Sequence, residues 1–572
     1  MSLDSDLGLP VPPERLTFGA FIHDVAERFG DNRALVFEGE PTTYRQLEEG
    51  ARAVAKACLA AGVAKGAKIG LLVGNRPEFV MAAFGAAMVG VVVVPVSTLA
   101  TGPERYHIVR HSDMAVLVVQ EQLLRHRFLD ELAADYPEVV AGTPGEVRAT
   151  AFPFLRRVIA LGTRVGNVQT WSEFLAAGEA VSDELLDAAA SEVLPYDDVM
   201  IIYTSGTTAE PKAVVHTHRS VTAMLWRWGL QMQLTAADRL WSVFPFFWTA
   251  GFGMMLGGTL ACGATLLLQD GFDAAEALAM IEREGATMVH AFAHTEAQLV
   301  DHPDAKTRDL SSLTRIRPGS PLGNLLGITE DSEDAWDLRS GYGASETFTI
   351  STALPADAPH HLRVRSHGLP LPGMRLRIVD AETGAPLPQG ESGEITVRGV
   401  HLMRTYYKLA PEKVLDDEGW FHSQDAGYFD EEGYLHWHGR ISGLIKTGGS
   451  NVSPVEVETR AMDLATLGVV SVVGVPHPLM GEIVVMCAVP LRDVEPDIPR
   501  VVEHMKATLA PYKIPRRILL FDEDDFGFTA SDKVLFDELR RAAARRIVEG
   551  DDDDQEWVAY LKEYLEEGSD HH

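Results

Sequence analysis

The stretch Tyr203-Thr-Ser-Gly-Thr-Thr-Ala-Glu-Pro-Lys-Ala-Val-Val-His-Thr-His218 carries more information about this chain than any other segment. An apolar run, Met200 to Tyr203, leads into it and predicts a buried strand. Small hydroxyl-bearing or glycine residues follow the strand, and then come Pro211 and Lys212. Backbone N–H groups and hydroxyls in such a turn converge where an anion can sit, with the lysine ammonium beside it. The segment therefore predicts a phosphate-binding loop, although its spacing is not that of a Walker A loop.

The residues around this loop predict the fold class. Through the first 300 residues or so, short runs of Val, Ile and Leu alternate with longer amphipathic stretches. This alternation is typical of βαβ units on a mostly parallel sheet, so we expect an α/β fold. The expected strands are Lys68 to Val73, Val91 to Val96, Ala115 to Val119, Met200 to Tyr203, Ala264 to Leu268 and Thr287 to His290.

The sequence pattern changes near Ser366, and the change predicts further domains. Gly/Pro turns then separate short strands, which is typical of an antiparallel β subdomain, and a smaller α+β unit follows from about Arg440. At 572 residues the chain is also too long for one hydrophobic core. We therefore expect a large N-terminal domain over residues 1–439 and a small, mobile C-terminal domain over residues 440–572. The expected elements are strands at Leu376 to Val379, Gly393 to Arg398, Tyr434 to Gly439, Val469 to Val475 and Val484 to Pro490, and a helix at Pro499 to Leu509.

The last segment, Asp551 to His572, begins with four aspartates and continues with the spacing of an amphipathic helix. Its apolar positions include Trp557 and Leu561. We interpret it as a solvated tail packed weakly on the body, with a partner-binding helix as the alternative.

The charge balance excludes several classes of partner. The formal net charge is −32 at pH 7, and so acidic a surface repels nucleic-acid backbones and anionic lipid headgroups. Phe79 to Pro103 carries no charge, but Gly90 and Pro95 divide it into a small-residue helix and a β-branched strand. We therefore expect a buried helix and strand there, and no integral membrane segment. The acidic start, Met1 to Asp6, does not resemble a secretion signal, so we expect a cytoplasmic protein.

Further segments return in the order known from one enzyme superfamily. With the phosphate loop, they resemble the adenylate-forming enzymes, which include acyl-CoA synthetases, peptide-synthetase adenylation domains and beetle luciferase. The resemblance covers about Leu16 to Arg540. The matching segments are Gly319-Ser-Pro-Leu322, Gly341-Tyr-Gly-Ala-Ser-Glu346, Gly419-Trp-Phe-His-Ser-Gln-Asp425, Gly439-Arg440 with Lys446-Thr-Gly-Gly-Ser-Asn451, and Ser531-Asp-Lys533.

The resemblance implies an ATP-dependent acid–CoA ligase that uses Mg²⁺. A carboxylate attacks the α-phosphate of ATP to give an acyl adenylate and pyrophosphate, and the thiol of CoA then takes the acyl group. Two anions must meet in the first step, so the site needs fixed positive charge, for which the resemblance implies Lys533 together with Lys212. It implies Glu346 as the Mg²⁺ residue.

The resemblance also assigns nucleotide-binding roles along the chain. The implied ATP-binding residues are Thr204, Ser205, Gly206, Thr207, Thr208, Lys212, Ser320, Gly341, Tyr342, Gly343, Ala344, Ser345, Asp425, Trp437, Arg440 and Lys533. Among them, Tyr342, Ser320 and Trp437 would lie around the adenine. Asp425 would accept hydrogen bonds from both ribose hydroxyls.

The second step implies a rotation of the small domain about a hinge near Ser442, after which Gly448 and Gly449 line the CoA channel. The implied acyl-binding residues are Phe247, Trp248, Gly251 and Gly343. Aromatic and methionine residues near them favour an apolar acid, with fatty, alicyclic and aromatic acids all open. His216 and His218 are interpreted as structural hydrogen-bonding residues.

Several positions depart from the family pattern: Ala209, Ser442, Asp532 and Trp248. Two alternatives stay open. One is an adenylating enzyme that passes its acyl group to a carrier protein or to oxygen. The other is a non-catalytic relative that binds ATP, which the departures at Ala209, Ser442 and Asp532 keep open. The oligomeric state is open as well, with a homodimer as one option.

Overall fold

The computed structural model describes residues 7–143, 145–204, 212–329, 332, 335–336, 341–355, 358–363, 365–447, 450–464, 466–491, 494–509, 511–522, 526, 536–550 and 554–567. The chain forms two compact units. The N-terminal unit contains Met1–Leu376 and Val397–His422, and the C-terminal unit contains Arg377–Thr396 and Ser423–His572. The expected boundary at residue 440 falls inside the second unit, so its role as a hinge stays a prediction.

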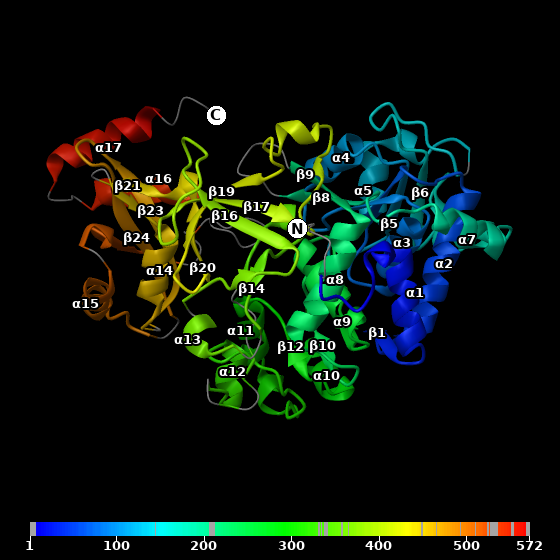
Figure 1. Ribbon diagram of the computed structural model, residues 1–572, viewed down its shortest axis with the longest axis horizontal. Helices are drawn as coiled ribbons and strands as arrows, with labels where there is room; N and C mark the ends of the chain where they lie inside the picture. Colours follow the sequence, from blue (N-terminus) through cyan, green and yellow to red (C-terminus); the bar gives the residue numbers. More distant parts are fainter. Residues whose placement is uncertain are drawn as a thin grey trace. The chain divides into compact units, whose positions relative to one another are not determined.

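The largest sheet of the N-terminal unit contains β8 and β9, the two strands that flank the predicted phosphate loop (Figure 1). Its strand order is β18-β9-β8-β4-β3-β5-β6-β7. Strands β3 to β8 pair in parallel, as the sequence predicts, whereas β9 runs antiparallel to β8 and β18 antiparallel to β9. The strands are β3 (Lys68–Leu72), β4 (Val92–Pro95), β5 (Val116–Gln120), β6 (Arg157–Leu161), β7 (Gln169–Thr170), β8 (Asp198–Thr204), β9 (Lys212–Thr217) and β18 (Thr405–Tyr406).

Two smaller sheets complete the N-terminal unit. One has the order β12-β10-β11-β1-β2 and is parallel except for its edge strand β2, and the other has the order β13-β14-β15. The strands are β1 (Arg33–Phe37), β2 (Glu40–Thr43), β10 (Arg239–Trp241), β11 (Thr265–Leu268), β12 (Met288–Val289), β13 (Gly341–Tyr342), β14 (Thr352–Ala353) and β15 (Leu369–Pro370).

Helices cover these sheets, and their apolar faces form the core. The helices are α1 (Phe18–Phe29), α2 (Tyr44–Ala60), α3 (Pro77–Met88), α4 (Gly102–His111), α5 (Phe128–Asp135), α6 (Trp171–Gly178), α7 (Asp183–Ser191), α8 (His218–Met232), α9 (Gly258–Ala261), α10 (Ala274–Glu284), α11 (Ala293–Asp301), α12 (Pro321–Leu326) and α13 (His360–Arg363). The uncharged stretch forms α3 and β4, which are buried, so the helix and strand predicted there are confirmed. Within the described ranges, every helix falls short of the length and hydropathy that a bilayer span requires.

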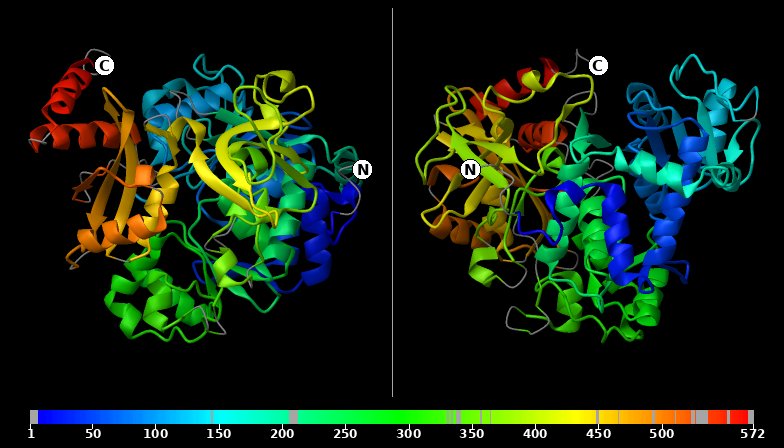
Figure 2. Two further views of the ribbon diagram at one scale, coloured as in Figure 1. Left: turned by 60° about the vertical axis from the view of Figure 1, so that its left-hand side comes forward. Right: turned by 45° about the vertical axis from the view of Figure 1, so that its right-hand side comes forward.

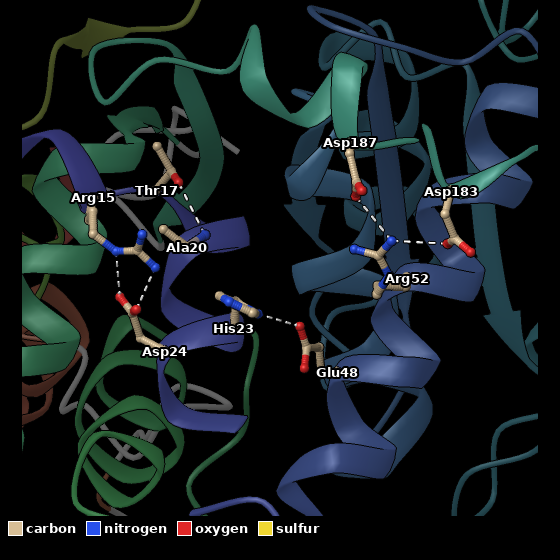
Figure 3. A network of polar contacts seen from close by, with 9 residues as sticks. All are labelled: Arg15, Thr17, Ala20, His23, Asp24, Glu48, Arg52, Asp183 and Asp187. Carbon is tan, nitrogen blue, oxygen red and sulfur yellow. Dashed lines mark hydrogen bonds and ion pairs between the residues drawn. The ribbon is translucent and has the colours of Figure 1, made fainter. Parts of the chain in front are cut away.

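Polar contacts at the surface join three of these helices (Figure 3). The Thr17 hydroxyl caps α1 by accepting from the backbone N–H of Ala20. His23 of α1 lies 2.8 Å from Glu48 of α2. The Arg52 guanidinium of α2 lies 3.0 Å from the carboxylates of both Asp183 and Asp187 on α7. Exposed ion pairs of this kind each contribute about 0–1 kcal/mol, so they add little to the stability of the contact between α7 and α2.

The C-terminal unit is built largely on two sheets. One has the order β16-β17-β19-β20, with β20 antiparallel to β19. The other has the order β22-β21-β24-β23, in which neighbouring strands run antiparallel, and β25 pairs in parallel with β24. The strands are β16 (Met374–Val379), β17 (Gly393–Gly399), β19 (Phe421–Phe429), β20 (Leu435–Arg440), β21 (Ile445–Thr447), β22 (Ser450–Val452), β23 (Leu467–His477), β24 (Gly481–Pro490) and β25 (Arg517–Leu520). The helices are α14 (Pro454–Met462), α15 (Ile498–Thr508), α16 (Phe536–Glu549) and α17 (Gln555–Glu567).

The two faces of the hairpin β23–β24 carry different cores, because alternate residues of a strand point to opposite sides. One face, which includes Val473 and Val485, packs on α16 and α17. The other, which includes Val472 and Met486, packs on α14 and α15 (Figure 2). The expected strands and helix of this unit are confirmed.

Helix α17 corrects one expectation. The sequence suggested a tail that packs weakly, but Trp557 is 1% exposed and Leu561 is 0% exposed, and both belong to the core around β23. The Trp557 indole Nε1–H also donates to the carbonyl of Pro476 at 2.7 Å. The apolar face of this helix is therefore part of the core of the C-terminal unit, whereas Lys562 and Glu563 are exposed.

Candidate active site

The ends of the predicted phosphate loop are fixed by strand pairing. Thr204 ends β8 and Lys212 begins β9, and the two residues are partners in the antiparallel register. The loop is thus the connection of an antiparallel hairpin, a geometry that the sequence did not predict. The exposed side chain of Lys212 extends over the ring of Tyr406, with its ammonium 5.3 Å from the ring centroid.

The second predicted segment, Gly341 to Glu346, leaves strand β13 in a tightly folded loop. A Cβ on Gly343 would lie 2.2 Å from the carbonyl oxygen of Thr349, so only glycine fits. Phe348 and Thr349 have φ of +48° and +97°. Such values are costly for a β-branched residue and cluster at functional sites. Phe348 is fully buried, and its contact with His216, at 4.9 Å between ring centroids, holds the strained turn in place.

Glu346, the predicted metal residue, is held from two directions. The Tyr406 hydroxyl donates to its carboxylate at 2.7 Å, and the backbone N–H of Met403 donates to its carbonyl at 2.7 Å. The sequence analysis did not select Tyr406 or Met403. No periodicity could indicate them, because they lie far along the chain from Glu346. The pairing of β18 with β9, which brings them close, is visible only in the structure.

His216 supports the same loop from β9. Its Nε2–H donates to the carbonyl oxygen of Ser345 at 2.7 Å. Burial lowers the pKa of His216 to about 4, so the ring is neutral near pH 7. His218 accepts from the backbone N–H of Phe18 through Nδ1 at 3.2 Å, and burial lowers its pKa to about 3. The structural role predicted for both histidines is confirmed.

The residues around Glu346 fit a magnesium ion. Mg²⁺ keeps most of its waters and takes one or two carboxylates together with substrate phosphates. Glu346 offers one half-buried carboxylate whose orientation is fixed by a hydrogen bond. Among the described residues, no group of three or more His, Cys, Asp or Glu side chains could hold a metal alone. This donor set suits an ion that arrives with a nucleotide.

The predicted acyl-binding segment contains a π-helix, η3 (Ala250–Gly257), which is typical of functional sites. A Cβ on Gly251 would lie 2.0 Å from the carbonyl oxygen of Pro245, so the start of this helix needs glycine. Phe247 is buried, and its ring lies 5.5 Å from that of Trp248. Trp248 in turn lies 6.1 Å from Phe292, centroid to centroid.

Asn75 fixes the turn that leads into this segment. Its side-chain amide donates to the carbonyl of Phe244 and accepts from the backbone N–H of Phe246, both at 2.9 Å. Sequence inspection did not select Asn75, because a single asparagine after a strand carries no specific signal.

Ser320 has a structural use in addition to its predicted one. Its hydroxyl caps helix α12 by accepting from the backbone N–H of Gly323 at 3.0 Å. Tyr342 is buried on β13, and its backbone N–H donates to the Thr352 hydroxyl at 3.1 Å. Its exposed fraction of 6% leaves little ring surface free in this conformation.

In the C-terminal unit, the structure brings Asp425 and Arg440 together. They are register partners on β19 and β20, and the guanidinium Nε lies 3.1 Å from the buried carboxylate of Asp425. Arg440 also donates to the carbonyl of Ser423 at 2.7 Å. Trp437 lies on the same strand β20, and Ser442 lies in the short turn η7 (Ile441–Gly443).

The remaining predicted site residues lie outside the described residues. They are Ser205, Gly206, Thr207, Thr208, Gly448, Gly449 and Lys533, and the departures Ala209 and Asp532 lie outside as well. A cavity of about 700 Å³ elsewhere in the N-terminal unit, lined in part by Arg148, Arg156 and Arg157, includes none of the predicted site residues.

Two family models match this chain in sequence. The model of the AMP-binding enzyme matches residues 22–407, and that of the AMP-binding enzyme C-terminal domain matches residues 456–533. The chain belongs to the AMP-binding enzyme family. This membership confirms the predicted superfamily. Together with the CoA ligases among the relatives described next, it confirms the predicted class of acid–thiol ligase, with ATP and CoA as co-substrates.

Relatives in this family match over nearly their whole length. The chain is 30% identical to indoleacetate–CoA ligase of Aromatoleum aromaticum over 519 residues, which cover 90% of this chain and 95% of the relative. It is 30% identical to feruloyl-CoA synthase of an Amycolatopsis species over 512 residues, which cover 88% and 94%. The crystal structure of the anthranilate CoA ligase AuaEII in complex with anthranoyl-AMP has the same fold, with a TM-score of 0.76, 24% identity, and coverage of 95% of this chain and 99% of that one.

Proposed function

We propose that this AMP-binding enzyme is a ligase that joins an apolar carboxylic acid to CoA through an acyl adenylate. The observation that carries the proposal is the arrangement around Glu346, where an oriented carboxylate and the Lys212 ammonium both contact Tyr406 beside the phosphate-loop strands. An acid-activating enzyme needs such a combination, because a metal–nucleotide complex and a fixed cation must be held together.

In the first step, the loop from Thr204 to Lys212 would bind the β- and γ-phosphates, with Lys212 beside them. Ser345 would donate its hydroxyl to a phosphate oxygen. Glu346 would hold Mg²⁺, which offsets the charge of the leaving pyrophosphate. Lys533 would draw the substrate carboxylate and the α-phosphate together, because two anions otherwise repel each other.

Asp425 would bind the ribose, supported by Arg440. A buried carboxylate can accept from two hydroxyls at once, and the ion pair with Arg440 holds its orientation. A hydrogen bond to a charged group contributes roughly 1.5–3 kcal/mol. We expect Asp425→Asn to raise the KM for ATP by about 10- to 100-fold. Initial rates of pyrophosphate release at varied ATP measure this change.

The exposed Glu431 is the matched control for Asp425, since it lies at the turn that joins the same two strands. We expect Glu431→Gln to leave the KM for ATP unchanged. Equal KM values for Asp425→Asn and the wild type would remove Asp425 from the nucleotide site.

In the second step, a rotation near Ser442 would bring Gly448 and Gly449 to the entering thiol, as the resemblance implies. His216 and His218 do not serve as general bases in this proposal, because both are buried and already hydrogen-bonded. A cytoplasmic location and a homodimeric state stay predictions.

The aromatic residues around Trp248 support an apolar acid, and aromatic acids would stack on them best. The test is a pyrophosphate-release assay over aromatic, alicyclic, fatty and amino acids, each with and without CoA. We expect acid-dependent release with aromatic acids, formation of the CoA thioester, and at least about a tenfold lower kcat/KM for amino acids, whose ammonium would be desolvated.

The same assay separates the alternatives. Release that depends on the acid but yields no CoA thioester would favour a carrier protein or oxygen as the second acceptor. Absence of release with every acid would favour a non-catalytic ATP-binding protein, and the proposed function would be wrong.

A further inference from the structure

Tyr406 lies between two groups that the proposed chemistry uses. Its hydroxyl donates to the Glu346 carboxylate at 2.7 Å, and its ring face lies 5.3 Å from the Lys212 ammonium. Both Glu346 and Lys212 are predicted site residues, yet they come from different elements of the N-terminal unit. Among the described site residues, Tyr406 is a side chain shared by the metal residue and the phosphate lysine.

The backbone of Tyr406 is fixed independently of these contacts. It is part of strand β18 and is the register partner of Val214 on β9. The backbone N–H of Tyr407 donates to the carbonyl of Ala213 at 2.7 Å, directly after Lys212. A tyrosine has only two side-chain torsions, so a strand that is paired on this side holds the ring with little conformational freedom.

We propose that Tyr406 is a positioning residue that sets the Glu346 carboxylate for the magnesium–nucleotide complex and holds the Lys212 ammonium at the phosphate loop. The inference rests on the proposed function and adds a residue to it. The hydroxyl engages one carboxylate oxygen, Oε1, and so restricts the rotation of the carboxylate and the directions that Oε2 can take. A carboxylate that is oriented before the metal arrives loses less freedom on binding.

The ring acts on Lys212 by a different interaction. Lys212 is exposed, and its flexible side chain would otherwise sample many rotamers. The ring face attracts the ammonium electrostatically and so limits these rotamers. Unlike a carboxylate partner, the ring does not neutralise the charge of the ammonium. The lysine is therefore held near the loop but is still available to a phosphate.

The two contacts can be removed separately. Tyr406→Phe removes the hydroxyl and keeps the ring, whereas Tyr406→Leu removes both. Loss of a hydrogen-bonding partner behind a metal ligand weakens metal affinity by about 10- to 100-fold. We expect Tyr406→Phe to raise the Mg²⁺ concentration for half-maximal pyrophosphate release by about that factor, with kcat at saturating Mg²⁺ within about threefold of the wild type.

A binding measurement gives a readout besides activity. Titration calorimetry of the full chain with ATP, without acid or CoA, is carried out with EDTA and with Mg²⁺. We expect Tyr406→Phe to match the wild type in EDTA and to lose most of the gain in affinity that Mg²⁺ gives. We expect Tyr406→Leu to bind ATP more weakly under both conditions, because Lys212 is released as well.

Tyr407→Phe is the matched control, since the Tyr407 hydroxyl also donates to a carboxylate, that of Asp113, at 2.9 Å. Neither residue belongs to the predicted site, so we expect the Mg²⁺ dependence of this variant to be unchanged. Thermal unfolding of every variant shows whether the fold is kept, and Tyr406→Phe, which removes one oxygen atom, keeps the test valid where Tyr406→Leu fails to fold.

The outcomes separate this inference from the proposed function. A wild type that binds Mg²⁺–ATP, with Tyr406→Phe showing the same Mg²⁺ dependence, overturns the role of Tyr406 and leaves the proposed function intact. If Tyr406→Phe and Tyr407→Phe lose Mg²⁺-dependent ATP affinity equally, the two hydroxyls act only through the stability of the fold. That result also overturns the proposed role of Tyr406. A wild type that binds no ATP overturns the proposed function and this inference together.

Discussion

Lys533→Ala should lower the rate of acid-dependent pyrophosphate release by about 10²- to 10³-fold, the loss seen when one fixed group that stabilises transition-state charge is removed. The physical reason is that the acid carboxylate and the α-phosphate are both anionic, so their approach needs a cation placed in advance. The KM values should change less than kcat, because this stabilisation develops mainly in the transition state. Stopped assays of pyrophosphate measure the first step alone.

The second step supplies an internal comparison for Lys533. When a chemically prepared acyl adenylate and CoA are given, we expect Lys533→Ala to form the thioester within about tenfold of the wild-type rate, because the thiol attacks an uncharged carbonyl and no carboxylate has to approach a phosphate. Lys506, which is exposed on α15, is the control lysine, and Lys506→Ala should leave both steps unchanged. Near-wild-type adenylation by Lys533→Ala would contradict the assignment.

The sequence predicted the layers of the N-terminal unit well because buried strands leave local signals. Val92–Pro95 and its preceding helix are continuous apolar runs, and such runs indicate elements covered on both faces. The antiparallel direction of β9 was missed, because the phosphate loop hides the reversal within a short polar segment. The π-helix at Ala250–Gly257 was missed because its uniformly apolar sequence carries no period.

The candidate site was predictable where the sequence pattern is local and was not where the contact is distant. Asp425 and Arg440 were selected separately, and strand pairing brings them together. Tyr406 and Glu346 are 60 residues apart, so their hydrogen bond depends on the pairing of β18 with β9 and on where the segment after β13 lies. The positive φ of Thr349 was also not predictable, because threonine gives no local indication of it.

The second large effect concerns the stability of the C-terminal unit and involves α17, which the sequence analysis predicted to be a weakly packed tail. The Trp557 side chain packs in the core beside Val473 and Val475, and Arg517 lies over its ring at 5.6 Å. Truncating a buried tryptophan to alanine costs about 3–5 kcal/mol. We expect Trp557→Ala to shift the urea transition of the C-terminal unit to clearly lower concentration, as followed by circular dichroism on the full chain.

Two variants of α17 decide what this shift means. Tyr560 is 40% exposed on the same helix, so Tyr560→Ala should change the free energy of unfolding by no more than about 0.5–1 kcal/mol. Trp557→Phe keeps most of the buried area but leaves the Pro476 carbonyl without its indole donor, so it should cost an intermediate amount, about 1–3 kcal/mol. If Trp557→Ala were as mild as Tyr560→Ala, α17 would contribute nothing to the core, and the weakly packed tail would be the correct description. The predicted order, with alanine worst, phenylalanine intermediate and Tyr560→Ala mildest, arises only if the helix is an integral part of the C-terminal unit.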